Sequence, residues 1–579
     1  MNTDTTPRIP VEVNGIQYNF CKNPKCSNFG VPASQEKLPE NNAYIIGRGG
    51  VDLPLLKCTC CGETPPLKSN QGIFEEVERL SAYLKIATDS PCCSNAECSN
   101  HTIPVGTKRA YASFGTTASG AKRFRCNACN KTLTISKPTY RQVDTHHNIE
   151  IFKLLVNKVP LNRIINILDI SWEVLYHRMN FIHKQCMAFV SNRENKLKDM
   201  PIDRLYLAID RQDYEVNWTE RKDKRNVILS AITSADNATG YVFGIHPNFD
   251  STIDKQQIEI DSIIAQDNLR KNPFKKYARL WLESDYNKAH KQSSTYKKSK
   301  RLMESIRDTY NELSKREDIE VKEATITEKL PDYGVQVRAE YTMIGHFYFL
   351  KKMLGNVGKW RFFLDQESGI RSACLTAFKD EVANHKAEAF YVKIEKELTV
   401  DEKREFKAIA KRNFEDMREK FSHLSENQVK IEMLKQEIQS VLHLGKFQDS
   451  WVKHPFPSMA EANKAMCWLT EHNEGDMDLN HKAWLYNKAS LHGVDNFFQK
   501  VRRRMSMFER PIHSSSSAGR TWNGYGCYNP SHAVKMLEIF RVVHNYIDTK
   551  KEGGTKTTPA MRLGLADAPI DYKTVLYYE

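Results

Sequence analysis

The sequence has no long apolar run. Its mean hydropathy is −0.58, and no segment is long and apolar enough to cross a bilayer, so we expect no membrane-spanning helix. The stretch 1–13 is polar and lacks the apolar centre of a secretory signal peptide, so we expect a cytoplasmic protein. Thiols stay reduced in that compartment, which disfavours structural disulfides.

The sequence also lacks an excess of acidic residues. It has 85 Lys and Arg against 71 Asp and Glu, and its formal net charge is +14. A basic surface attracts phosphates through counterion release whatever the base sequence, although a solvated basic surface without a partner is the alternative. The length of 579 residues leaves room for several domains. Charge and length together predict a multidomain protein with nucleic acid as its default partner.

The cysteines form a repeated pattern. A Cys-x4-Cys knuckle, a stretch containing Tyr and Gly, and a Cys-x2-Cys knuckle follow one another twice. The first copy contains Cys21, Cys26, Cys58 and Cys61, and the second contains Cys93, Cys98, Cys126 and Cys129. Four thiolates in two close pairs are the ligand set of a tetrahedral zinc site. The sequence therefore predicts two tandem zinc ribbons, each with a bound Zn²⁺ ion.

Core cysteines or disulfides are the alternative to zinc, but the duplicated paired spacing favours metal. Cys60 and Cys92 each adjoin a predicted ligand and compete with it. The spacing, together with Gly62 after Cys61, favours the ligands named above. The remaining four cysteines are scattered, and we expect them to be small buried hydrophobic residues: Cys186, Cys374, Cys467 and Cys527.

Behind the second copy the hydrophobic period becomes helical. The spacing predicts helices over 148–159 and 160–168 and a third that begins at Trp172. Two short helices, a tight turn and a longer helix are typical of a helix-turn-helix, although the periodicity alone fits a plain three-helix bundle. Its position behind two ribbons on a basic chain favours DNA binding. The residues predicted to contact DNA on the third helix are Tyr176, His177 and Arg178.

From residue 204 the pattern becomes that of strands. Alternation and turn signals predict a three-stranded meander over 205–209, 226–232 and 241–245, and its first strand ends on Asp210. A strand ending on an acid is a candidate site because its carboxylate is presented at the edge of a sheet.

The same arrangement recurs farther along. A strand over 360–364 ends in Asp365, and a helix over 367–382 and a strand over 389–394 follow it. The order of strand, acid, helix and strand predicts that Asp210 and Asp365 lie on neighbouring strands of one α/β sheet. Paired carboxylates of this kind can hold a divalent metal ion.

A third acid is expected from a later helix. Asp495 lies at the start of the helical segment 491–504, and three arginines suited to phosphate contacts follow one to two turns later. They are Arg502, Arg503 and Arg504.

The order of these parts resembles the bacterial insertion-sequence transposases of the DDE class, in which zinc ribbons and a helix-turn-helix precede an RNase H-like catalytic core. The matching motifs are Asp210 on the first strand, Leu-Asp365-x-x-Ser-Gly, and Val-Asp495-Asn-Phe-Phe before the arginines. The tail, with His-Asn545-Tyr and Thr558-Pro-Ala, resembles the closing segments of integrase-type transposases. The resemblance covers most of residues 20–579.

The resemblance implies an enzyme that binds the ends of its element and catalyses metal-dependent DNA strand cleavage and strand transfer. Asp210, Asp365 and Asp495 would hold two Mg²⁺ or Mn²⁺ ions for an in-line displacement at phosphorus. It implies a bacterial, cytoplasmic protein whose partners are double-stranded DNA, from element ends and target, and further copies of itself in a homodimer or higher oligomer. The residues that would hold phosphates are Arg502, Arg503, Arg504, Arg510 and Arg520.

Two other functions fit the same parts. A domesticated transposase that acts as a DNA-binding regulator would keep the ribbons and the helix-turn-helix but not the cleavage. An RNase H-like nuclease would cut DNA without joining it. The reaction product separates the nuclease from the transposase.

The resemblance sets the expected architecture, which is multidomain: tandem zinc ribbons, an all-α helix-turn-helix and an α/β RNase H-like core with helical insertions. The predicted boundaries are ribbon 1 over 1–66, ribbon 2 over 67–140, the helix-turn-helix over 141–200, the core over 201–530 with insertions at about 251–340 and 399–470, and a tail over 531–579.

The acids depart from the commoner family pattern in two ways. The third is Asp rather than Glu, and it lies far from Asp365 along the chain. Asp285, which also ends a short apolar run, is the rival second acid; Asp365 is favoured because a helix and a clear strand follow it. Glu509 is the rival third acid, but we expect it to end the helix in an ion pair.

Overall fold

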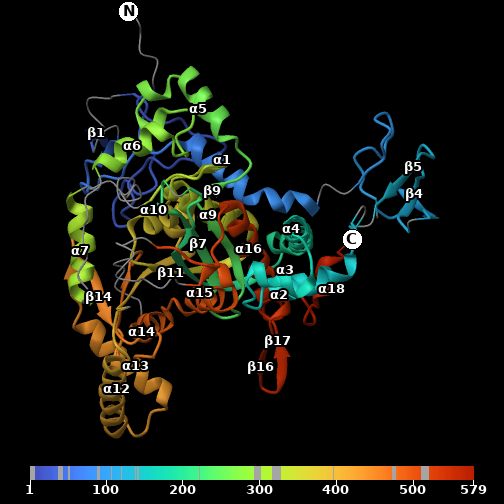
Figure 1. Ribbon diagram of the computed structural model, residues 1–579. Helices are drawn as coiled ribbons and strands as arrows, with labels where there is room; N and C mark the ends of the chain where they lie inside the picture. Colours follow the sequence, from blue (N-terminus) through green and yellow to red (C-terminus); the bar gives the residue numbers. More distant parts are fainter. Residues whose placement is uncertain are drawn as a thin grey trace, which may run out of the picture.

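The computed structural model describes residues 7–36, 43–49, 53–87, 91–105, 107–118, 120–136, 138–139, 142–220, 222–292, 302–315, 328–395, 397–471, 478–509 and 521–578 (Figure 1). Helices cover both faces of a large mixed sheet at its centre, so the protein is a multidomain α/β structure with smaller units around one core. Among these residues no helix combines the length and the apolar character that crossing a bilayer demands.

The central part of the sheet is built from five strands. β6 (Ile202–Val216), β7 (Val227–Asp236) and β8 (Val242–Pro247) form the predicted antiparallel meander. β11 (Val357–Asp365) pairs in parallel with β6 on one side and with β12 (Ala387–Ile394) on the other. The order across the sheet is β8-β7-β6-β11-β12, so β6 and β11 lie side by side at its centre.

The segment 399–470 is not a purely helical insertion. Its first half forms the helices α12 (Val400–Lys420) and α13 (Glu426–Gln439), as predicted. Its second half forms three antiparallel strands that extend the sheet beyond β12 to eight strands. These are β13 (Leu442–Leu444), β14 (Asp449–Lys453) and β15 (Lys464–Trp468).

One face of the sheet is covered by α9 (Ala339–Met353) and α10 (Ser368–Ala377). The ring of Phe347 on α9 lies 5.9 Å from that of Phe362 on β11. α10 follows β11 directly, so the residues that join them lie at the end of the central parallel pair.

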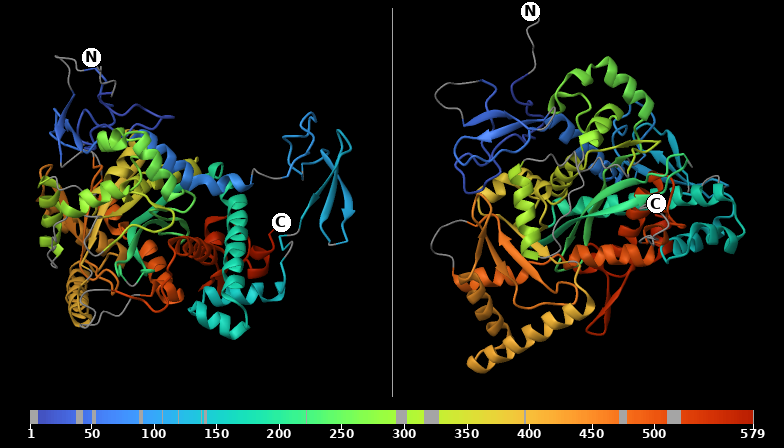
Figure 2. Two further views of the ribbon diagram at one scale, coloured as in Figure 1. Left: turned by 45° about the horizontal axis from the view of Figure 1, so that its top comes forward. Right: turned by 60° about the vertical axis from the view of Figure 1, so that its left-hand side comes forward.

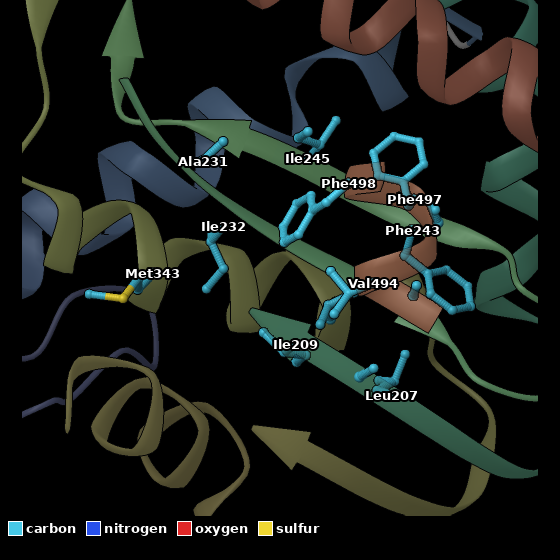
Figure 3. Packing of buried hydrophobic residues seen from close by; sticks show 14 of the residues in the cluster. Leu207, Ile209, Ala231, Ile232, Phe243, Ile245, Met343, Val494, Phe497 and Phe498 are labelled. Atoms are coloured by element: carbon cyan, nitrogen blue, oxygen red, sulfur yellow. The ribbon is translucent and has the colours of Figure 1, made fainter. Parts of the chain in front are cut away.

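The opposite face is covered by α14 (Leu479–Lys488) and α15 (His492–Arg504). The ring of Trp484 on α14 lies 6.4 Å from that of Tyr206 on β6. α15 packs over the meander through an apolar side that includes Val494 and Phe498, both labelled in Figure 3. Burial of this apolar side is what fixes the helix on the sheet.

The segment predicted to be a helix-turn-helix forms three helices, α2 (Asn148–Leu155), α3 (Leu161–Leu168) and α4 (Trp172–Glu194). α4 begins at Trp172 as expected, because the Ser171 side chain caps it by accepting a hydrogen bond from the Val174 N–H. α16 (Pro530–Val542) and α18 (Tyr572–Leu576) pack against α4. The tail is therefore not a separate unit, because it packs with this helical part.

Ribbon 1 contains the hairpin of β1 (Tyr44–Arg48) and β2 (Pro54–Cys58). After it come α1 (Asn70–Ser81), which packs on α9, and the 3₁₀ helix η1 (Ala82–Ala87), which packs on α4. The predicted boundaries place the stretch 70–87 in ribbon 2, but it belongs to the body of the protein.

Ribbon 2 is a three-stranded antiparallel sheet of β3 (Tyr111–Thr116), β4 (Lys122–Cys126) and β5 (Thr132–Ile135). It stands apart from the rest of the molecule, whereas ribbon 1 lies against the body (Figures 1 and 2).

The described part of the segment 251–340 is mainly helical, as predicted. It contains α5 (Lys255–Ile264), α6 (Glu283–Gln292) and α7 (Leu302–Lys315). Its end, β10 (Val335–Gln336), pairs with β9 (Phe249–Asp250), so the segment leaves and rejoins the body at one place.

Candidate functional site

The four predicted ligands of ribbon 1 come together. The Sγ atoms of Cys21 and Cys61 are 3.5 Å apart, those of Cys26 and Cys58 are 3.7 Å apart, and all four lie within 4.8 Å of one another. Four sulfurs about 2.3 Å from a tetrahedral zinc ion are separated by about 3.8 Å, so this donor set fits zinc.

The ligands of ribbon 2 form the same arrangement. The Sγ atoms of Cys93 and Cys129 are 3.4 Å apart, and those of Cys98 and Cys126 are 3.6 Å apart. Among the described residues, no other set of three or more His, Cys, Asp or Glu side chains has its ligand atoms all within 4.8 Å of one another.

One tyrosine in each ribbon pairs across the strands with the first cysteine of the Cys-x2-Cys knuckle, Tyr44 with Cys58 and Tyr111 with Cys126, and its hydroxyl bonds the Cys-x4-Cys knuckle. In ribbon 1 the Tyr44 hydroxyl accepts a hydrogen bond from the Cys21 N–H at 3.0 Å, and it lies 2.8 Å from the Asn28 carbonyl and 2.7 Å from the Val31 carbonyl. In ribbon 2 the Tyr111 hydroxyl makes the same contacts with Cys93, Asn100 and Ile103, at 2.8, 2.9 and 2.7 Å. The duplicated Tyr in the sequence therefore has a structural role that spacing alone did not reveal.

The surroundings of one sulfur in each ribbon, that of Cys58 and that of Cys126, favour the thiolate that zinc requires, whereas burial raises the pKa of the Cys21 and Cys26 thiols. The Asn28 amide donates to Cys58 Sγ and the Asn100 amide donates to Cys126 Sγ, each at 3.3 Å. Burial raises the pKa of both thiols, but backbone N–H groups and these amides outweigh it, so the pKa falls to about 7 for Cys58 and about 6 for Cys126.

The other cysteines lie outside both groups. Cys60 is exposed, with its Sγ 3.5 Å from the Ser27 hydroxyl, and Cys92 is half-buried. The expectation that the scattered cysteines are buried is confirmed for all four: Cys186, Cys374, Cys467 and Cys527.

Ribbon 1 is held to the body by charged groups that the sequence analysis missed. Glu63 Oε1 lies 3.0 Å from Arg371 Nη1 on α10, and Arg371 also donates to the Lys22 carbonyl at 3.2 Å. Lys68 forms a buried ion pair with Glu340 on α9. Ribbon 1 therefore braces both helices on one face of the sheet.

Ribbon 2 instead presents a cationic strand. Lys122, Arg123 and Arg125 lie on β4, and the guanidinium carbons of the two arginines lie 5.1 and 5.7 Å from the ring centre of Phe114 on β3. Phe114 is 44% exposed. Residues 91–136 contain six Lys or Arg and one Glu, so the ribbon has an excess of positive charge.

Asp210 and Asp365 are neighbours at the centre of the large sheet. β6 and β11 pair in register up to Ile209 and Leu364, so the next residue in each strand is the acid. Neighbouring strands lie about 4.8 Å apart and side chains alternate between faces, so both carboxylates start from the face covered by α14 and α15. Asp365 ends its strand as predicted, but Asp210 lies inside β6, which continues to Val216 because it pairs with the whole of β7.

Polar groups surround this acid pair. Arg211 and Glu367 form an ion pair at 3.2 Å and join the residues next to the two acids. Thr233 on β7 lies directly opposite Asp210. Gln212 is two residues after Asp210 on β6 and therefore on the same face of that strand. Thr233 Oγ1 and Gln212 Oε1 are buried without a hydrogen-bond partner among the described residues, so oxygen atoms beside the acids are left for a further ligand.

Asp495 lies in the first turn of α15 and is half-buried. Asn237, at the end of β7, holds this end of the helix by accepting a hydrogen bond from the Gly493 N–H at 2.9 Å. Lys500 faces His544 of the C-terminal helices, so Asp495 and Arg502 lie on the other flank of α15. In the described structure the carboxylates of the three predicted acids do not form a group within 4.8 Å.

Both rival acids are held in ion pairs. Asp285 is buried between Lys275 at 2.6 Å and Arg338 at 3.1 Å, outside the large sheet. Glu509 lies 2.9 Å from Lys158 Nζ, so its expected ion pair is confirmed.

The residues predicted to contact DNA on α4 differ in exposure. His177 is exposed and lies 3.7 Å from Glu173. Tyr176 is half-buried and stacks on His532 with ring centres 4.4 Å apart. Arg178 is buried and donates to the Val143 carbonyl, so its guanidinium joins α4 to the preceding loop.

The three arginines of α15 also differ in exposure and in their contacts. Arg503 is exposed and Arg502 is half-buried. Arg504 forms an ion pair with Asp548 and donates to the Val156 carbonyl at 3.2 Å, so it fixes the end of the helix. The two remaining predicted phosphate contacts, Arg510 and Arg520, lie outside the described residues.

The chain has no match among protein-family models, curated proteins or solved structures. Its function is therefore inferred from its own residues and their arrangement.

Proposed function

We propose that the protein is a DNA transposase of the DDE class, with an RNase H-like core that cuts and joins DNA strands. The observation that carries this proposal is the register of β6 and β11, which sets Asp210 and Asp365 side by side on parallel central strands. A divalent metal site for phosphoryl transfer needs carboxylates that lie side by side on adjacent strands and on the same face of the sheet.

The strand order supports the same core. An antiparallel meander whose first strand also pairs in parallel with a fourth strand, itself parallel to a fifth, is the arrangement expected of an RNase H-like sheet. The later helix α15 packs on β6 and β7 of this sheet and would supply Asp495 from its first turn.

The donors suit magnesium or manganese. Asp210, Asp365 and Asp495 are oxygen donors, and Thr233 Oγ1 lies unpartnered opposite Asp210 among the described residues. Three carboxylates that would share two ions between them need not all meet at one point, so a group within 4.8 Å is not required. Such ions, when bound, activate a water or 3′-hydroxyl nucleophile and stabilise the leaving oxygen.

Exposed or half-buried cations would supply the contacts to DNA. Arg503 on α15, and Arg123 and Arg125 on ribbon 2, are positions from which a guanidinium can reach a phosphate. Transposition joins two DNA ends, so two active sites, and hence a homodimer or higher oligomer on DNA, are part of the proposal.

A second candidate is a DNA-binding regulator that does not cut DNA. The observation that favours it is the absence of a compact three-carboxylate group among the described residues. The regulator would bind DNA through the same cationic surfaces.

The test is a cleavage and joining assay on DNA carrying the two ends of the element that encodes the chain, with Mg²⁺ or Mn²⁺. We expect joined products from the unaltered protein and none from Asp210→Asn, Asp365→Asn or Asp495→Asn, with losses of at least roughly a hundredfold. Nicked products without joined ones would indicate the nuclease. DNA binding without any product in either metal would indicate the regulator.

The matched control is Asp213→Asn. Asp213 lies on β6, three residues after Asp210, but it is exposed and accepts a hydrogen bond from the Ser230 hydroxyl at 2.5 Å. The same change of charge on the same strand should leave activity within about twofold. If Asp213→Asn abolished activity as fully as Asp210→Asn, the assignment of the acid pair would be lost.

A further inference from the structure

The C-terminal part of the chain contains a small hairpin that no predicted site includes. β16 (Lys550–Glu552) and β17 (Thr555–Thr557) form a two-stranded sheet of their own, joined by Gly553 and Gly554 at φ values of 56° and 91°. Two glycines in the left-handed region are the residues that a tight two-residue hairpin turn requires. The hairpin projects from the body in two different views (Figures 1 and 2).

The charges on this hairpin oppose its folding. Lys551 and Lys556 face each other directly across the two strands, and both are exposed. Like charges at directly opposite positions destabilise a strand pair, and a lone two-stranded hairpin is marginal in water. A negatively charged partner between or along these lysines would remove the repulsion.

The base of the hairpin is firmly attached. Asp548, just before β16, forms an ion pair with Arg504 of α15. Arg562, just after β17, donates to Thr557 Oγ1 at 3.0 Å and to the Thr239 carbonyl at 2.7 Å. The body therefore holds both strands at one end, and the lysines and the glycine turn are presented to solvent at the other.

The hairpin continues a cationic region that begins on α15. Lys500 lies on the side of α15 that faces the C-terminal helices, with Nζ 3.2 Å from His544 Nδ1. Burial lowers the pKa of Lys500, and although Asp548 raises it, the nearby charges of Arg504, Arg562 and Lys550 lower it further. Cations of the helix and of the hairpin are thus close enough to act on one another.

We propose that the β16–β17 hairpin is an arm that contacts the phosphates of a DNA duplex, with Lys551 and Lys556 as its contact residues. A two-stranded β-hairpin is narrow enough to enter the major groove of B-form DNA, and the side chains on its edges then lie close to the phosphates. The Gly553–Gly554 turn has no side chain that would hold the backbone away from the DNA. The proposal rests on DNA being the substrate of the proposed function.

The experiment measures binding of the full-length, zinc-loaded protein to a fluorescein-labelled duplex of arbitrary sequence, by anisotropy across a salt series. The variant is Lys551→Gln with Lys556→Gln. We expect its affinity to fall roughly ten- to a hundredfold at about 0.1 M salt, and the slope of log affinity against log salt to decrease by about 1.8, because two phosphate contacts are lost. Its melting temperature should not fall, because the substitution removes a repulsion.

The control variant is Lys407→Gln with Lys411→Gln on α12, where both lysines are exposed. It removes the same charge from another projecting element and should keep the affinity and the salt slope. If the protein binds the duplex and the hairpin variant keeps both values, the arm is not a DNA contact and the proposed function stands. If the protein binds no duplex at any salt concentration, the proposed function fails as well. A hairpin variant that binds DNA normally but loses self-association in light scattering would make the hairpin a protein contact.

Discussion

Ribbon 1 and ribbon 2 have the same arrangement of four cysteines and different surroundings. Each has a group of four cysteines, a tyrosine whose hydroxyl bonds the Cys-x4-Cys knuckle and an Asn amide on one sulfur. The residue after each Cys-x2-Cys knuckle is left-handed in both, Gly62 at a φ of 73° and Asn130 at 59°. Ribbon 1 nevertheless packs on the body, and ribbon 2 stands apart from it.

The strand before the last knuckle shows where the two ribbons diverge. Counting back from Cys58, β2 has Lys57, Leu56, Leu55 and Pro54, whereas β4 before Cys126 has Arg125, Phe124, Arg123 and Lys122. Apolar residues in one copy are replaced by cations in the other. The two modules therefore share one arrangement of cysteines and differ in the charge of this strand and in their contacts with the body.

The largest expected effect comes from breaking one metal site at a time. Cys58→Ser should lower the melting temperature of the main unfolding transition by roughly 10 °C or more, because ribbon 1 braces α9 and α10. Cys126→Ser should leave that transition in place and remove one zinc ion per chain. Calorimetry together with zinc content checks both outcomes. Equal shifts in the two variants would mean that ribbon 2 also supports the body.

The next effect concerns the buried charge between ribbon 1 and α10. Glu63→Gln leaves Arg371 without its carboxylate partner and should cost about 3 kcal/mol in the free energy of unfolding. The control is Glu97→Gln, an exposed acid of ribbon 2, which should change that free energy by less than about 0.5 kcal/mol. Urea unfolding measures both, and a cost below about 1 kcal/mol for Glu63→Gln would show that the contact does not hold the ribbon.

For DNA affinity we expect the larger effect from changes in ribbon 2, whereas for stability it comes from changes in ribbon 1. Arg123→Gln with Arg125→Gln should weaken duplex binding roughly tenfold at about 0.1 M salt and reduce the salt slope, because two cations are lost from the free ribbon. Lys57→Gln, at the position in β2 that matches Arg125, should leave affinity within about twofold. Anisotropy measures both. Similar losses from the two changes would indicate a general effect of charge and not a contact at ribbon 2.

The smallest effect should come from the tyrosine hydroxyls. Tyr44→Phe removes the partner of the Cys21 N–H in a buried site and should cost about 1–2 kcal/mol in global unfolding. Tyr111→Phe should leave global unfolding unchanged and only speed the loss of zinc from ribbon 2 to a chelator. Denaturation and chelator competition are the two measurements. A global cost for Tyr111→Phe would contradict the independence of ribbon 2.

The local parts of the fold could be predicted from the sequence. The cysteine pairs are close in the chain, so their spacing defines both metal groups, and Ser171 before Trp172 correctly marks the start of α4. The end of β11 at Asp365 was also predicted, because the strand is a short apolar run that stops at the acid.

The parts that depend on distant partners could not. β6 continues past Asp210 because it pairs with all of β7, and the sequence around Asp210 does not predict that the strand continues. β15 was missed because it is stabilised by pairing with β12 across a long insertion. The burial of Arg178 follows from the position of the Val143 carbonyl, which periodicity on one helix does not contain.

For the candidate site, too, the sequence predicts the acids but not the residues around them. The sequence could place Asp210 and Asp365 on neighbouring strands, but Thr233 and Gln212 come beside them only through the register of β7 and through strand alternation. The contact of Glu63 with Arg371 joins residues that lie far apart in the chain and lack any shared motif. Ionic contacts between units are set by how the surfaces meet, so they are visible only in the structure.

Both ends of ribbon 2 lead back to the same helix. The chain enters the ribbon after η1 and leaves it before α2, and η1 and α2 both pack on α4. If the protein binds DNA as proposed, contacts from ribbon 2 to a duplex already held by another part of the chain are intramolecular, and their strength is governed by an effective concentration and not by the concentration of protein in solution. Individually weak contacts from the ribbon can then add substantially to the affinity of the whole chain.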